Sequence, residues 1–208
     1  MKKFLYFITL FLLTNFPAIS KNNTDQLNEL FLKLETEQNI IIASKIESKI
    51  WELWTTHPSE PTLTELLAEG SYYMSQNQLD NAHKIFSKAI ELDPKWAEAW
   101  NKRATVYYLM GNYELSQNDI DVVLSLEERH FGALSGQGLV QSALKNYQLA
   151  IDSYVEAHKI YPAMESPIIM IEKLKTLIKN QSAQKNYNKK GEGMKVHQHL
   201  FFEHVQQA

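Results

Sequence analysis

Small and large apolar positions recur every 34 residues along three consecutive segments, 63–96, 97–130 and 131–164. A small residue stands at the eighth position of each segment and a large one at the twenty-fourth. In chain order these are Gly70, Ala104 and Gly138, then Phe86, Ile120 and Tyr154. Small residues let two helices cross closely, and a fixed period of this length is typical of helix-turn-helix repeats. The pattern predicts an all-α protein, an α-solenoid of three such repeats.

The ends of the helices are also marked in the pattern. Pro94 and Pro162 close the first and third segments, because proline lacks an amide donor and disfavours helical geometry in the residue before it. The second segment has Glu128 at that place, so we expect its second helix to continue toward His130. The fifteenth position, between the two helices, is Asn77, Gly111 or Lys145. Lysine adopts the left-handed conformation of a helix exit poorly, so the third turn departs most from the pattern.

Leu66, Trp100 and Leu134 occupy the fourth position of the three segments. With this signature, the segments resemble the tetratricopeptide repeat (TPR) family over about half of the chain. A narrower resemblance joins the run 100–105 and the run 129–136 to exported bacterial TPR proteins without assigned chemistry. The family resemblance implies that the first helices line a concave groove that binds a peptide or protein partner. Its groove positions give the following candidate contacts: Leu67, Ser71, Met74, Asn101, Thr105, Tyr108, Ser135, Leu139 and Ser142.

The predicted groove is mixed in character, with small and weakly apolar side chains and a single acid, Glu98. TPR proteins of the carboxylate-clamp subtype, which bind chaperone C-termini, need basic groove residues where Gly132 and Gly136 stand here, although Asn101 is retained. The resemblance therefore disfavours a chaperone tail. An extended peptide or a helix with apolar anchors fits better. The alternative is that these side chains only solvate the inner face.

The seventh position departs from the leucine of the family and is Glu69, Arg103 or Gln137. Equivalent residues of neighbouring repeats lie roughly above one another in a solenoid. We therefore expect Glu69 and Arg103 to pair across the boundary between repeats, with Gln137 extending the row. A ligand-facing arginine is the alternative.

The segments that flank the repeats have different patterns. Residues 1–20 are typical of a cleavable signal peptide, with Lys2 and Lys3 before an apolar run over 4–13 and small residues at Ala18 and Ser20. The run is shorter than the roughly 20 residues of a membrane-spanning helix. We expect a periplasmic protein without a stable membrane anchor after cleavage, with an uncleaved anchor as the alternative.

Residues 25–56 have apolar positions at helical spacing and predict an N-terminal helical pair, either a cap or a degenerate repeat. Residues 165–179 predict a C-terminal capping helix, and 180–208 a flexible polar tail. The tail contains an aromatic cluster at 200–202 that could dock on a groove. Its histidines, His197, His199 and His204, give a second, less favoured interpretation as ligands of zinc or copper.

Composition excludes several classes of function. The sequence has no cysteine, which rules out disulfides and thiolate metal sites, and its net charge of −3 disfavours nucleic acid as a partner. We find no catalytic constellation and expect no enzyme activity, no cofactor and no metal. The sequence thus predicts a periplasmic scaffold or adaptor protein. The alternative is a structural component of the envelope that associates with itself into an oligomer. Its groove would be filled by its own N-terminal helices or tail.

Overall fold

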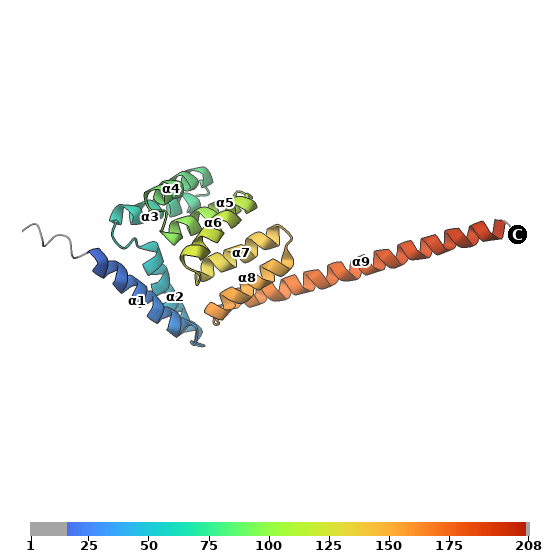
Figure 1. Ribbon diagram of the computed structural model, residues 1–208, viewed down its shortest axis with the longest axis horizontal. Coiled ribbons are helices and arrows are strands. Elements are labelled where there is room, and N and C mark those ends of the chain that lie inside the picture. Colours follow the sequence, from blue (N-terminus) through green and yellow to red (C-terminus); the bar gives the residue numbers. More distant parts are fainter. Residues whose placement is uncertain (1–15, 207–208) are drawn as a thin grey trace, which may run out of the picture.

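The computed structural model describes the backbone of residues 16–206 and the side chains of residues 23–185. Within these limits the chain contains helices and no strand (Figure 1). The N-terminal pair is followed by three antiparallel pairs and a last long helix. These elements are α1 (Phe16–Leu34), α2 (Ile40–Thr55), α3 (Pro61–Ser75), α4 (Leu79–Leu92), α5 (Ala97–Leu109), α6 (Tyr113–Leu126), α7 (Phe131–Ala143), α8 (Tyr147–Ile160) and α9 (Glu165–Gln206).

The two helices of each repeat cross at the small eighth position. A Cβ atom built on Gly70 would lie 2.5 Å from the ring of Phe86, and one built on Gly138 would lie 2.5 Å from the ring of Tyr154. The large residue of the second helix therefore packs directly on the backbone of the first. In the middle repeat the close approach is polar, since the Ser116 hydroxyl donates to the Ala104 carbonyl at 2.8 Å.

In all three repeats the turn between the two helices has a residue in the left-handed conformation at the fifteenth position. The φ angles are 56° at Asn77, 78° at Gly111 and 64° at Lys145. Lys145 thus adopts the turn geometry that glycine and asparagine adopt easily. The third repeat keeps the conformation of the other two despite its less favourable residue.

The second helix of the middle repeat ends earlier than the sequence predicts. α6 stops at Leu126, and the expected continuation to His130 is wrong. His130 begins the next helix instead, because its Nδ1 atom accepts a hydrogen bond from the Ala133 amide at 3.0 Å and caps α7. A cap of this kind requires a residue outside the helical conformation, so α6 must end before it.

The seventh positions of the second and third repeats, Arg103 and Gln137, each pair with the second helix of their own repeat. Arg103 makes a bidentate ion pair with Asp119 of its own repeat, with both N···O distances at 2.8 Å. The Gln137 side chain accepts from the Ser153 hydroxyl at 2.9 Å in the same way. The predicted pair of Glu69 with Arg103 is therefore wrong. Glu69 is exposed at the free edge of the first repeat.

Other polar contacts do cross the boundaries between repeats. The Arg103 guanidinium also donates to the Ser87 hydroxyl of the preceding repeat at 3.2 Å. Two further pairs link the second helix of one repeat to the first helix of the next. They are His83 with the Tyr107 hydroxyl at 2.9 Å and Gln117 with Gln141 at 2.8 Å.

The N-terminal pair does not stack on the first repeat in the way that one repeat stacks on the next. The face of α3 that would receive it is exposed and mainly polar, with Glu65, Glu69, Tyr72 and Gln76 where later repeats carry buried or half-buried residues. Polar outer faces are typical of terminal solenoid repeats, so α3 itself ends the stack. The pair instead lies alongside the repeats and packs near the start of α7 (Figure 1).

The N-terminal pair is fixed there by a mostly apolar cluster. Phe31, Ile50 and Trp54 are buried with Phe131 of α7 and Tyr161, which follows α8. The Tyr161 hydroxyl lies 3.0 Å from a carboxylate oxygen of Glu47. Burial, together with this carboxylate, raises the pKa of Tyr161 to about 12, so the hydroxyl is a donor at neutral pH. The pair is thus an integral part of the core.

The last helix begins as a cap and continues beyond it. Pro167, Ile171 and Leu174 are buried on the side of α9 that meets α8. The sequence predicts a flexible polar tail over residues 180–208, but α9 runs to Gln206 and projects away from the repeats (Figure 1). No proline follows Pro167, and the lysines, glutamines and asparagines of this segment permit a helix even though they supply no apolar face.

Several sequence predictions fall on residues that lie outside this description. The basic start and apolar run of the predicted signal peptide occupy residues 1–15, and only residues 16–20 belong to α1. The side chains of the aromatic cluster at 200–202 and of the three tail histidines are likewise outside the described residues. No helix in the part that is described has the length and apolar character needed to cross a bilayer.

Candidate functional site

α2 covers one part of the inner face. Gly132, at the start of α7, lies directly under the indole of Trp51, and a Cβ atom there would be 2.6 Å from the ring. Trp51 and Trp54 also make edge and tilted contacts with the ring of Phe131, at centroid distances of 5.5 and 5.2 Å. The glycine that replaces a basic groove residue therefore admits a tryptophan of the same chain.

A buried carboxylate lies beneath this contact. Glu98 of α5 is 1% exposed, and three side chains approach it. The distances to its oxygens are 2.9 Å from Asn101 Nδ2, 3.1 Å from Lys102 Nζ and 3.1 Å from His130 Nε2. Burial alone would raise the pKa of Glu98. The hydrogen bond from His130 and the interactions with the Lys102 ammonium outweigh burial and hold this pKa below its ordinary value.

His130 links this carboxylate to α2. Its Nδ1 atom accepts the Ala133 amide hydrogen bond, so in the neutral ring the proton is on Nε2, which donates to Glu98. The imidazole is fully buried and stacks on the Trp54 ring at 4.0 Å with an interplanar angle of 5°. One side chain therefore caps α7, donates to one oxygen of Glu98 and supports α2.

The end of α2 is attached to the first repeat as well. The Trp96 indole donates to the Trp54 carbonyl at 2.9 Å. His57 follows the helix and lies 2.9 Å from Asp93, while its Nδ1 accepts the Glu60 amide at the start of α3. α2 is thus held to all three repeats or their connections.

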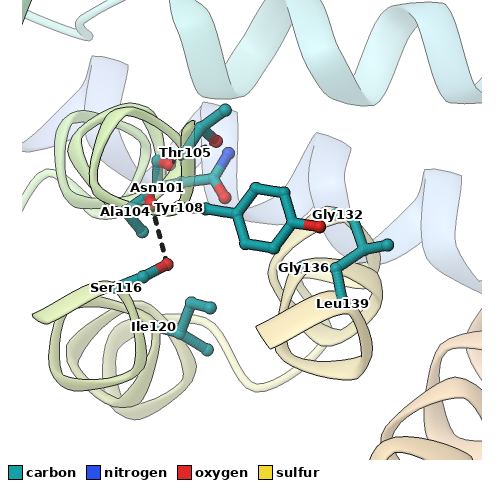
Figure 2. A pocket seen from close by; sticks show the side chains of 9 residues that line it. All are labelled: Asn101, Ala104, Thr105, Tyr108, Ser116, Ile120, Gly132, Gly136 and Leu139. Atoms are coloured by element: carbon teal, nitrogen blue, oxygen red, sulfur yellow. Dashed lines mark hydrogen bonds between the residues drawn. The ribbon is translucent and has the colours of Figure 1, made fainter. Parts of the chain in front are cut away.

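The part of the inner face that α2 leaves free contains a crevice of about 60 Å³ between α5, α6 and α7. Figure 2 shows the Tyr108 ring extending from α5 toward α7, with Ser116 and Ile120 on α6. The crevice has no charged residue in its lining. It is lined by Asn101, Ala104, Thr105, Tyr108, Ser116, Ile120, Gly132, Gly136 and Leu139.

Four of the candidate contacts from the sequence come together in this crevice: Asn101, Thr105, Tyr108 and Leu139. The others do not line it. Leu67 is buried in the core of the first repeat, and Met74 packs against the same core. The hydroxyls of Ser71 and Ser142 donate to carbonyls of their own helices, and the Ser135 hydroxyl is buried without a partner among the described residues.

Sequence reasoning did not count Gly136, or Ser116 and Ile120 of α6, among the candidate contacts, and it missed the role of α2. Gly136 carries the clearest signal, because it stands one turn after Gly132 at another position where the family resemblance expects a basic side chain. Trp51 and Trp54 lie beside a regular apolar stripe and signal that α2 buries more than one face. No group of three potential metal ligands occurs among the described residues.

Comparisons with known proteins find other proteins with repeats of this kind. A family model described as TPR repeat matches residues 70–111. A TPR repeat-containing protein of Rhizobium etli is 36% identical over 144 residues, which are 69% of this chain and 70% of that protein. Hsp70-Hsp90 organizing protein 1 of Glycine max is 28% identical over 104 residues, half of this chain but 18% of that protein.

Solved structures share the fold. The first TPR of Spaghetti (RPAP3), bound to the HSP90 peptide SRMEEVD, has a TM-score of 0.54 at 20% identity, with 56% of this chain and 92% of that chain covered. The Sgt2 TPR domain of Aspergillus fumigatus has a TM-score of 0.57 at 19% identity, with 60% and 83% covered. The prediction of an all-α solenoid is confirmed.

Proposed function

Because this chain belongs to the tetratricopeptide repeat family, whose solved members include domains bound to peptides, we propose that it is a non-enzymatic adaptor that binds a peptide or protein partner. The observation that carries the proposal is the uncharged crevice between α5, α6 and α7, which opens on the inner face. Grooves of this kind bind peptides through apolar anchors and a few polar groups.

The chemistry of the inner face favours an uncharged partner segment. The HSP90 peptide in the Spaghetti structure, SRMEEVD, is acidic. In this chain Gly132 and Gly136 carry no charge, and the Trp51 ring covers Gly132. The nearby Lys102 is paired with Glu98 at 3.1 Å. An acidic tail would find no free basic side chain in the crevice, whereas an apolar segment would meet Tyr108 and Leu139.

We place the adaptor in the periplasm as part of the same proposal. Support comes from the sequence, where Lys2 and Lys3 precede a short apolar run and small residues at Ala18 and Ser20. Cell fractionation with N-terminal sequencing of the mature protein tests this setting. A mature chain that starts after residue 20 in the periplasmic fraction is expected, and an intact N-terminus in the cytoplasmic fraction would contradict it.

Affinity capture from a periplasmic extract tests the adaptor. The immobilised protein should retain a specific partner, which Tyr108→Ala should lose because the crevice wall is gone. Tyr72→Ala is the matched control, since Tyr72 is 62% exposed at the free edge of the first repeat, outside the crevice. Equal capture by the wild type and Tyr108→Ala would rule out the crevice as the binding site.

A second function is favoured by one observation, the occupation of part of the inner face by α2. The protein would then be a structural component of the envelope that associates with itself. Sedimentation velocity of the purified protein distinguishes the two proposals. A concentration-dependent oligomer together with the absence of any captured partner would favour the structural role, and a monomer that captures a partner would favour the adaptor.

A further inference from the structure

Two glycines lie one turn apart on the inner side of α7, and only one of them is covered. The space over Gly132 is filled by the Trp51 ring, whose nearest atom would be 2.6 Å from an added Cβ. At Gly136 the nearest atom to an added Cβ is Ile120 Cδ1 at 3.8 Å, which is an ordinary contact distance. The crevice over Gly136 therefore continues the interface between α2 and α7, but no side chain of the described residues fills it.

The walls of this crevice suit an apolar group. They present Ile120, Leu139 and the Tyr108 ring, with no charged lining residue. The nearest buried charge, Glu98, is already held by Lys102 and His130. A cavity of roughly 150 Å³ in a protein core accommodates benzene. By the same scale, the crevice volume of about 60 Å³ has room for two or three carbon atoms.

We propose that the crevice over Gly136 is a specificity site that takes one valine-sized apolar side chain of an extended partner peptide. This inference rests on the proposed adaptor function. The absence of a side chain at Gly136 creates the space, Ile120 forms its floor, and Tyr108 and Leu139 flank its entrance. Asn101 and Thr105 also line the crevice; the Asn101 amide donates to Glu98 and the Thr105 hydroxyl to the Asn101 carbonyl, so each side chain offers a partner backbone an acceptor oxygen.

The test uses minimal peptides as probes and is independent of the natural partner. N-acetyl-valine methylamide is titrated into the purified full chain while the methyl signals of Ile120 and Leu139 are followed by NMR. We expect a saturable shift of these signals. The glycine analogue, which lacks the isopropyl group, should bind about fiftyfold more weakly because three buried carbon atoms are missing.

The Gly136→Ala variant should abolish the valine-dependent shift, because its methyl group occupies the crevice. Ser71→Thr is the matched control, since it adds a methyl group to the first repeat outside the crevice. Far-UV circular dichroism establishes that both variants fold. Equal shifts with the glycine and valine probes, or a valine shift that survives in Gly136→Ala, would overturn the inference.

Partner capture separates this inference from the adaptor function itself. A partner that Tyr108→Ala loses but Gly136→Ala retains would overturn the specificity site and leave the adaptor function intact. If no partner is captured, but the valine probe binds the wild type and not Gly136→Ala, the adaptor function is overturned. The site for an apolar side chain at Gly136 is then supported.

Discussion

At the scale of single residues, glycines of similar appearance in the sequence have opposite roles in the structure. Gly138 is in contact with the Tyr154 ring, whereas Gly136 faces the open crevice. Both stand in the first helix of the third repeat, but the 34-residue pattern identifies only Gly138 as a helix-crossing residue. The difference depends on which second-helix side chain lies opposite, and only the packed structure specifies that.

Gly136→Ala should therefore stabilise the protein. Alanine in a helix interior is favoured over glycine by roughly 0.5–1 kcal/mol, and the added methyl group meets no close contact. Gly138→Ala should destabilise it, since the new Cβ would lie 2.5 Å from the Tyr154 ring. Urea unfolding of both variants measures the difference. A loss of stability in Gly136→Ala would show that its surroundings are tighter than described.

Lys145 is a second residue with a measurable conformational cost. Its φ of 64° lies in the left-handed region, which costs a residue with a side chain about 1 kcal/mol or more relative to glycine. Lys145→Gly should raise the free energy of unfolding by about 0.5–1 kcal/mol after the greater freedom of glycine in the unfolded chain is included. Thermal melts would measure the gain, and the reciprocal change Gly111→Ala, at φ 78°, should give a loss.

At the scale of elements, the 34-residue pattern predicts the three repeats and their order but assigns the polar contacts to the wrong helices. Periodicity shows which positions are equivalent. It does not show whether Arg103 turns toward the preceding repeat or toward its own second helix. In the structure it does both, with the carboxylate of Asp119 as its ion-pair partner. The acid at position 119 occurs in one repeat only, so no repeated signal reveals this pair.

Arg103→Ala should destabilise the solenoid by about 3 kcal/mol. The change removes a bidentate partner from Asp119, whose side chain is 6% exposed, and a buried carboxylate without its partner is costly. Lys175→Ala is the control, because Lys175 and Glu172 are both more than half exposed and their ion pair contributes little. Chemical denaturation distinguishes the two, and similar small losses would show that Asp119 finds water or another donor.

At the scale of the whole molecule, the sequence predicts that α1 and α2 form a helical pair but not where the pair lies. Its apolar stripe has the spacing of any amphipathic helix, and the stripe does not identify the surface against which it packs. The placement depends on Gly132, His130 and Tyr161, which all lie far from α2 in the sequence. The free part of the inner face, and hence the candidate site, follows from that placement.

The Glu98 cluster should make the docking of α2 sensitive to acid. A carboxylate whose folded-state pKa is lowered stabilises the fold above its ordinary pKa of 4.5, and this contribution is lost as the pH falls through the folded-state value. Glu98→Gln should be less stable than the wild type at pH 7 by about 1–3 kcal/mol, and the gap should narrow below pH 4.5. Melting temperatures from pH 7 to pH 3 measure both curves, and parallel curves would contradict the assignment.

The position of α2 has a consequence for the folding of this small solenoid. In an open array each repeat contacts only its neighbours, so folding can start anywhere and spread. Here Asn28 bonds to Arg129 and Glu47 to Tyr161, contacts that join residues 101 and 114 positions apart. Such long-range closure slows folding, because the chain loses loop entropy before these contacts form. It also couples the ends of the array, so we expect one cooperative transition in place of gradual fraying from the first repeat.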